Sequence, residues 1–223
     1  MSRTRGTAGG RARVPDWRPA AWQAQSLLLD YPDERLLAHR PLLRGVAGAL
    51  PPAVGGPLHR FLDHLDATPA GELAADYVAT FDQRRRCSPY LTYFSHGDTR
   101  RRGVALLRFT QAYRAAGVHL DGSALPDRPG GGELPDHLAV VLEFAATADA
   151  EAGLTLLLEH RAGLELLRLA LRELRSPWAA VLDSVSATLP PLRGTDHGAV
   201  ARLAAEGPPE EQVGLAPYGR VPT

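Results

Sequence analysis

The residues with the clearest potential for chemistry are arginines and aromatic side chains in the stretch 77–103. This stretch holds six arginines, in the runs 84–86 and 100–102, against two aspartates, so its local charge is positive. Aromatic rings interleaved with guanidinium groups form contact surfaces for peptides or nucleic acids. The same residues also have a structural interpretation, in which Asp98 or Thr99 caps a following helix and the aromatic rings fill the core. From the residues alone, both interpretations stay open.

Motifs for catalysis or metal binding are missing from the sequence. Its eight histidines are scattered, and there is no HExxH motif, phosphate-binding loop or GxSxG motif. The single cysteine, Cys87, cannot form an intramolecular disulfide or a cysteine-cluster metal site. The neighbouring run 84–86 would favour a thiolate, so a Cys87 nucleophile is one alternative. We expect no enzyme activity and no bound cofactor.

The overall composition is that of an ordinary globular protein. Of the 223 residues, 44% are hydrophobic and 22% are charged, and the formal net charge is zero. All cationic residues except histidine are arginine, a bias typical of a GC-rich coding sequence. Zero net charge gives no global attraction to nucleic acid or acidic lipid. The first apolar run, 27–29, is too short for a signal peptide or a membrane span, so we expect a cytoplasmic protein.

The elements that must position these residues are helices. Apolar residues recur at helical spacing, and no stretch alternates with period two for long enough to form a strand. We predict an all-α protein with a disordered arm over 1–15, a helical domain over 16–206 and a flexible, acidic, Pro/Gly-rich tail over 207–223. Within the domain, the predicted helices are 17–30, 33–49, 55–67, 70–81, 98–116, 135–148, 150–175, 177–189 and 195–206.

Two of these helices show their local signals clearly. In 98–116, apolar residues follow two edges, which predicts a helix buried over most of its circumference. In 135–148, Pro135 suits the first turn and Asp136 suits the positive end of the helix dipole. The segment between them, 117–134, is rich in proline and glycine and is predicted to be a flexible loop.

Four segments, in this order and spacing, resemble the nitrate reductase delta-subunit family, the NarJ-type chaperones. They are the LL-x-YPD segment 28–33, the Y-x-x-x-FD-x-x-R segment 77–85, the G-D-T-R-x-RG segment 97–103 and the ELPDHL segment 133–138. The resemblance covers about residues 22–190. Two departures are Pro89, where the family usually has an apolar residue, and a longer loop over 121–132.

The resemblance implies a single-domain, TorD/NarJ-like helical bundle that acts as a chaperone without catalysing a reaction. Such proteins bind the immature catalytic alpha subunit of nitrate reductase, notably its N-terminal segment, in the cytoplasm. They keep it competent for insertion of the molybdenum cofactor and an iron–sulfur cluster, and they delay membrane docking. Proteins that deliver the molybdenum cofactor are a second class of expected partner. The chaperone is not part of the finished enzyme.

We therefore expect a groove near residues 82–103 that binds a client peptide by burying apolar anchors. In it, Arg85, Arg100 and Arg102 would contact acidic or carbonyl groups, oriented by Asp82 and Asp98. The full set of predicted partner-binding residues is Tyr77, Phe81, Asp82, Arg85, Tyr90, Tyr93, Gly97, Asp98, Arg100, Arg102 and His137. Three alternatives remain: a nucleic-acid-binding module, a protein that binds the phosphorylated cofactor directly, and the Cys87 enzyme.

Overall fold

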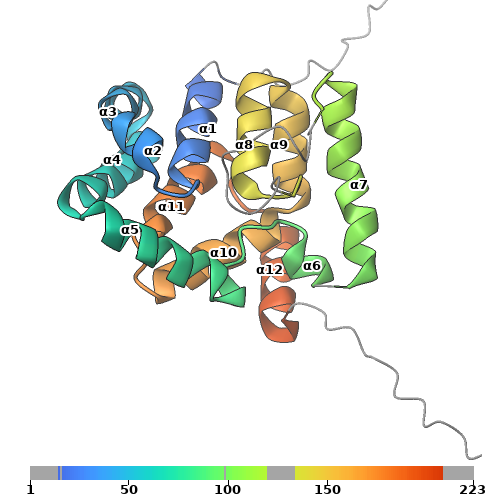
Figure 1. Ribbon diagram of the computed structural model, residues 1–223. Coiled ribbons are helices and arrows are strands. Elements are labelled where there is room, and N and C mark those ends of the chain that lie inside the picture. The colour runs from blue at the N-terminus through green and yellow to red at the C-terminus, as the bar shows by residue number, and fades with distance from the viewer. Residues whose placement is uncertain (1–14, 16, 98, 120–133, 208–223) are drawn as a thin grey trace, which may run out of the picture.

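The computed structural model describes residues 15, 17–97, 99–119 and 134–207. Within these ranges the chain is a helical bundle, which confirms the all-α prediction (Figure 1). None of the helices in these ranges is long and apolar enough to cross a membrane. The α-helices are α1 (Trp17–Leu28), α2 (Glu34–Ala38), α3 (Arg40–Ala49), α4 (Pro52–Ala67), α5 (Ala70–Tyr77), α6 (Tyr93–His96), α7 (Arg100–Ala115), α8 (Leu138–Thr147), α9 (Ala150–Glu159), α10 (Arg161–Glu173), α11 (Trp178–Thr188) and α12 (Gly194–Glu206).

Most helices follow the predicted ranges, but two predicted helices are split, α4 begins at Pro52 instead of residue 55, and the short helix α6 was not predicted. The predicted helix 33–49 is split at His39, because Pro41 lies in the first turn of α3 and disfavours a continuous helix through it. The predicted helix 150–175 is split at His160. The predicted start of the helix at residue 33 is confirmed, because the Asp33 carboxylate caps α2 by accepting a hydrogen bond from the Leu36 N–H at 2.9 Å. The predicted arm, the 121–132 loop and the tail after residue 207 lie outside the described residues.

Helix α1 lies at the centre of the bundle and packs against α8 and α11. Three of its polar side chains donate hydrogen bonds across these contacts. The Trp22 indole N–H donates to Thr188 Oγ1 at 3.0 Å, and the Gln25 side-chain amide donates to Ser184 Oγ at 2.8 Å. The Ser26 hydroxyl donates to a backbone carbonyl of α8 at 2.7 Å. These buried bonds fix how α1 sits between its two neighbours.

Two glycines permit close helix contacts. A Cβ built at Gly153 in α9 would lie 2.3 Å from the Cβ of Ala145 in α8. A Cβ at Gly55 in α4 would lie 2.1 Å from the carbonyl oxygen of Ala47 in α3. Both separations are far below van der Waals contact, so any side chain at either position would force the helices apart.

Helix α7 corrects the prediction of a helix buried over most of its circumference. Phe109 and Tyr113 are buried, but Val104 is 71% exposed and Leu107 is 56% exposed. Figure 1 shows why: α7 stands at the edge of the bundle, so only one side of it faces other helices. The broad band of apolar residues in the sequence indicated burial. Because α7 lies at the edge, one side of that band is exposed to solvent.

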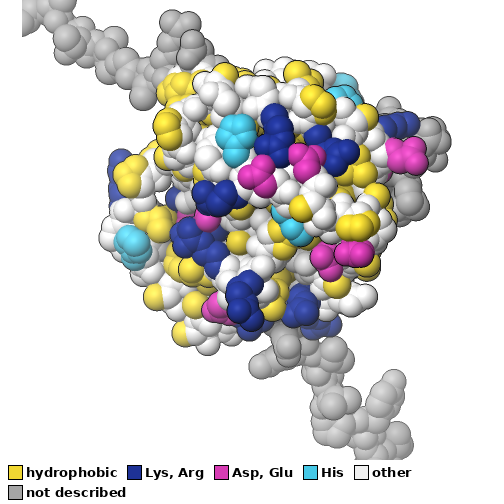
Figure 2. All heavy atoms as spheres, turned by 90° about the vertical axis from the view of Figure 1, so that its left-hand side faces the viewer, with side chains coloured by type: hydrophobic (Ala, Val, Ile, Leu, Met, Phe, Trp, Pro, Cys, Tyr) yellow, Lys and Arg dark blue, Asp and Glu magenta, His cyan; other side chains and the backbone are white. Residues whose placement is uncertain are grey.

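Ion pairs occur both on the exposed surface of the bundle and between buried side chains. On the side shown in Figure 2, basic and acidic side chains are interspersed, and Arg44 contacts both Asp63 and Asp66. Such exposed pairs add little stability. Between α10 and α11, by contrast, Glu165 is almost fully buried and accepts hydrogen bonds from Arg168 Nε at 2.7 Å and the Ser186 hydroxyl at 2.8 Å.

Candidate partner-binding site

The segment before α6 is joined to the segment before α8 through the backbone. The Leu91 N–H donates to the carbonyl oxygen of Asp136 at 3.0 Å. The Leu138 N–H donates to the carbonyl oxygen of Pro89 at 2.9 Å. Pro89, a departure from the expected apolar residue, therefore supplies the acceptor that holds the first turn of α8. The ELPDHL segment is thereby locked to the aromatic part of the arginine-rich stretch.

The Asp136 side chain extends this connection to α7. It is fully buried, and one carboxylate oxygen accepts hydrogen bonds from the Thr92 N–H at 3.2 Å and the Thr92 hydroxyl at 2.5 Å. The Arg102 guanidinium lies 3.5 Å from the same oxygen and donates through Nε to Thr92 Oγ1 at 3.2 Å. The sequence had indicated a helix-start role for Asp136. Instead, α8 begins two residues later, at Leu138, and the carboxylate connects three segments.

Aromatic rings cover this buried ion pair. The Arg102 guanidinium lies over the Tyr90 ring, 5.1 Å from its centroid. The Tyr90 ring meets the His137 ring edge-on at 5.3 Å, and His137 is itself buried. A cation above an aromatic face is attracted by the ring quadrupole. We call Tyr90, Thr92, Arg102, Asp136 and His137 the motif junction.

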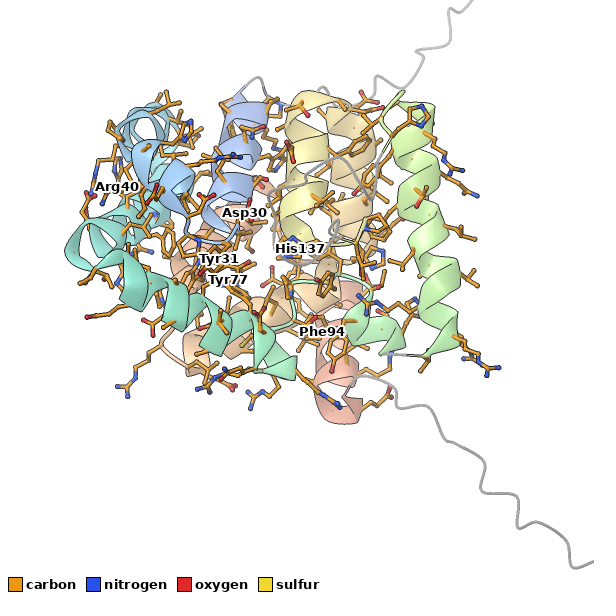
Figure 3. The ribbon with its side chains drawn as sticks, in the orientation of Figure 1. Asp30, Tyr31, Arg40, Tyr77, Phe94 and His137 are labelled. Atoms are coloured by element: carbon orange, nitrogen blue, oxygen red, sulfur yellow. The ribbon has the colours of Figure 1, made fainter. Side chains whose placement is uncertain are left out.

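A second group of rings, the aromatic cluster, comprises Tyr31, Tyr77, Phe81 and Trp178. Tyr77 meets Tyr31 edge-on at 5.5 Å, and its hydroxyl donates to the Leu29 carbonyl at 3.2 Å. Tyr77 and Phe81 both pack on Trp178, at 5.7 and 5.6 Å. A π-helical turn, Val78–Asp82, continues α5 and sets the spacing of these rings. Figure 3 shows Tyr31 and Tyr77 next to each other.

The predicted partner-binding residues divide into buried and exposed sets. Tyr77, Phe81, Tyr93, Gly97 and His137 are buried, while Tyr90 and Arg102 are partly buried. Gly97 ends α6 with φ of 56° and ψ of −152°, a conformation open essentially to glycine alone. The buried residues thus lie beneath the surface of the candidate site, and the more exposed residues are the ones that a partner would contact.

The exposed residues of the predicted set are Asp82, Arg85 and Arg100, and Asp98 lies outside the described residues. The sequence predicted that Asp82 helps to orient the arginines, but the ion pair that positions Arg102 is with another aspartate. Within the described part of the chain, Arg102 pairs with Asp136. Arg102 therefore stabilises the site from inside, whereas Arg85 and Arg100 remain candidates for direct contact.

Four residues of the site were not among the predicted set: Tyr31, Thr92, Asp136 and Trp178. Tyr31 is 46% exposed and adjoins the aromatic cluster, so it can contact both a partner and the core. Its position in the LL-x-YPD segment was a usable signal. No signal in the sequence pairs Thr92 with Asp136, because the two residues lie 44 positions apart.

Cys87 is unsuited to act as a nucleophile. It is fully buried, and burial raises the pKa of its thiol, while the charges of Arg84 and Arg86 oppose this shift only partly. A protonated, inaccessible thiol reacts slowly. At pH 7 we expect iodoacetamide to modify Cys87 at least about tenfold more slowly in the folded protein than in urea. Equal rates, followed by mass spectrometry, would show that the thiol is accessible.

His160 gives the fold a dependence on pH. It stacks on Phe109 of α7 at 5.0 Å. Burial lowers the pKa of His160 below its ordinary value of 6.5, with His96 acting in the same direction and Glu159 and Asp136 against it. The folded protein thus favours the neutral ring, and the unfolded chain binds more protons. The stabilisation is complete above about pH 6.5 and is lost as the pH falls below it.

We therefore expect the free energy of unfolding to fall between pH 7 and pH 5, and His160→Gln to flatten that dependence. Urea denaturation at several pH values measures both slopes. His39→Gln, at an exposed position, is the matched control for replacing a histidine. If wild type and His160→Gln have the same slope, the ring does not titrate differently in the folded state.

Among the described residues, no group of three His, Cys, Asp or Glu side chains could hold a metal ion. The exposed part of the candidate site carries aromatic rings and guanidinium groups. Aromatic and arginine side chains are the residues most enriched at the energetic centres of protein interfaces.

Comparison with known proteins places these features in a family. The family model for the nitrate reductase delta subunit matches residues 47–183. A nitrate reductase-like protein NarX of Mycobacterium tuberculosis is 40% identical over 187 residues, which cover 81% of this chain but 26% of that protein. A probable nitrate reductase molybdenum cofactor assembly chaperone NarJ of Bacillus subtilis is 33% identical over 77% of this chain and 89% of its own length. The Escherichia coli NarJ chaperone is 30% identical over 71% and 64%.

Proposed function

The chain belongs to the nitrate reductase delta subunit family, and we propose that it is a system-specific assembly chaperone and not an enzyme. Its client is the immature catalytic alpha subunit of a respiratory nitrate reductase in the cytoplasm. The chain keeps that subunit competent for insertion of the molybdenum cofactor and an iron–sulfur cluster, and it leaves before the complex is finished. The names of the Bacillus and Escherichia relatives, molybdenum cofactor assembly chaperones, support this role.

One structural observation carries the proposal beyond family membership. The four segments that resemble the family are joined in two contacts. Tyr31 against Tyr77 joins the first segment to the second, and Arg102 with Asp136 joins the third to the fourth. Each contact has a buried partner and a more exposed one, which suits a rigid support beneath a recognition surface.

The client segment is proposed to contact the more exposed side chains of these groups and two exposed arginines beside them. Tyr31 and Tyr90 offer aromatic surface, and Arg85 and Arg100 offer donors for carbonyl or acidic groups of the client. The N-terminal segment of the alpha subunit would fold on contact, as disordered segments that dock on helical surfaces do. The buried Arg102 holds Tyr90 in position from the other side.

The test is calorimetric titration of the purified protein with a synthetic peptide of the alpha subunit's N-terminus. We expect saturable binding with a Kd of about a micromolar or tighter, and none with a scrambled peptide. The double variant Arg85→Glu/Arg100→Glu should weaken binding by at least about tenfold, or about 1.4 kcal/mol. Arg60→Glu, on exposed α4, is the control for charge reversal. An unchanged Kd in the well-folded double variant would remove these arginines from the contact.

Two alternative functions predict different experimental results. A nucleic-acid-binding module would bind DNA with an affinity that falls steeply with salt, but the net charge of zero and the pairing of Arg86 with Glu173 argue against it. Direct binding of the phosphorylated cofactor would show as pterin copurifying with the protein. If neither the peptide nor the full apo-subunit binds, the assigned client is wrong.

A further inference from the structure

Helix α7 presents a straight stripe of side chains away from the bundle. The residues recur every three or four positions, which places them on one face of a helix. All five are exposed, and the two in the middle are apolar. We call this the outer stripe: Arg100, Val104, Leu107, Gln111 and Arg114. The opposite face of α7 carries the buried rings of Phe109 and Tyr113, so the two faces differ sharply in what they contact.

The outer stripe has one sign of charge. Helix α7 contains five arginines and no aspartate or glutamate. Two of these arginines pair with carboxylates outside α7, Arg102 with Asp136 and Arg108 with Glu159 at 2.8 Å. At the two ends of the stripe, Arg100 and Arg114 place positive charge on either side of the apolar pair. An apolar centre between cations is complementary to a helix with an apolar centre between carboxylates.

We infer that the outer stripe docks an acidic, amphipathic helix of the client subunit, at a surface that shares only Arg100 with the one proposed for its N-terminal peptide. This inference rests on the proposed function, because it takes the catalytic alpha subunit as the partner. The end residues of the stripe, Arg100 and Arg114, are 14 positions apart in the sequence. This separation corresponds to about 21 Å along the helix, the length of a partner helix of about four turns. Val104 and Leu107 lie under the partner's apolar residues, and its acids face Arg100 and Arg114.

A membrane surface fits these observations less well. Helices that lie in an anionic bilayer present a broad apolar face, commonly with aromatic residues, beneath a cationic one. The outer stripe has only two apolar side chains. Its cations lie at the two ends of the same stripe and not on a separate polar face. Nucleic acid would leave Val104 and Leu107 against phosphate, where they contribute nothing.

The position of α7 gives this docking a consequence for the site. Arg102 on the inner side of the same helix holds Thr92, Asp136 and Tyr90. A partner on the outer stripe therefore binds the helix that supports the motif junction. Docking at α7 and peptide binding near Tyr90 are connected through a single rigid element.

The experiment uses the full chain and the apo catalytic subunit. A photoreactive benzophenone amino acid replaces Leu107 in one sample and Leu42, a 63% exposed residue of α3, in the control. Mass spectrometry of the irradiated complex identifies the segment attached at each position. In parallel, Kd is measured for Val104→Ser/Leu107→Ser and for the control Leu42→Ser, with circular dichroism to check folding. Because both residues of the pair are exposed, the double variant should fold.

We expect position 107 to attach to a segment of net negative charge with apolar residues three or four positions apart, and position 42 to attach to none. The double variant should bind the apo-subunit at least tenfold more weakly, yet bind the N-terminal peptide as wild type does. If wild type forms the complex but position 107 attaches no more than position 42 and the double variant binds normally, the inference is wrong and the proposed function stands. The inference would be overturned in favour of a membrane by another result. In that result, wild type binds vesicles containing anionic lipid, the double variant does not, and position 107 does not attach to the client. Failure of the wild-type protein to bind the client would overturn both.

Discussion

Replacing Asp136 by alanine is expected to lower the free energy of unfolding by about 3–5 kcal/mol. The carboxylate is fully buried and is the acceptor for both the backbone N–H and the hydroxyl of Thr92. Its removal would take from the Arg102 guanidinium, whose side chain is 15% exposed, the buried carboxylate that opposes its charge. Removing one partner of a buried ion pair costs far more than the pair contributes, which is why this substitution ranks first.

Urea denaturation followed by circular dichroism measures this loss. Asp82→Ala removes an aspartate from an exposed position in the same region and should change stability by about 0.5 kcal/mol or less. Adding Arg102→Met to Asp136→Ala should restore part of the loss, because the unpaired charge is then gone. A loss below about 1 kcal/mol for Asp136→Ala would mean that solvent or another group compensates Arg102.

Trp178→Ala is the second substitution with a large expected effect, about 3–5 kcal/mol. The indole is 1% exposed and packs against Tyr77, Phe81 and Phe61. Truncation removes the largest member of the aromatic cluster and leaves a cavity that the surrounding helices can only partly fill. The substitution also removes the support of Tyr77, so binding of the client peptide should weaken at temperatures where the variant is still folded.

Trp178→Phe separates the two effects, because a smaller ring keeps part of the contact with Tyr77. We expect it to lose about half as much stability as Trp178→Ala and to retain peptide binding. Trp17→Ala, at a partly buried position near the start of α1, is the matched control. If Trp178→Ala and Trp17→Ala cost the same, the aromatic cluster is not a special source of stability.

Local sequence signals predicted the helices well where the relevant interactions were also local. Asp33 predicted a helix start, and its carboxylate caps α2. The leucines of 150–175 predicted helix, although not the break at His160. The burial of α7 was wrong for a physical reason: a broad apolar band shows what a helix can bury, while its neighbours in space decide what it does bury. Val104 and Leu107 are apolar and remain exposed.

The site was predictable in region but not in detail. The aromatic and arginine-rich stretch does adjoin the ELPDHL segment, yet the contact depends on Thr92 and Asp136, which the sequence separates by 44 positions. Asp136 also resembled an ordinary helix-start acid, a role that local pattern explains without any distant partner. Long-range pairing of polar side chains leaves no periodic trace, so only the structure reveals it.

The bonds that fix α1 also bear on how the chain is made. Trp22 in α1 donates to Thr188 in α11, and the two residues are 166 positions apart. At about 5–20 residues per second, a ribosome needs roughly 10–30 s to travel between them. During that interval the face of α1 that carries Trp22 and Gln25 has no α11 to cover it. The core is therefore completed only after α11 has been synthesised, and until then the nascent chain passes through a stage prone to aggregation.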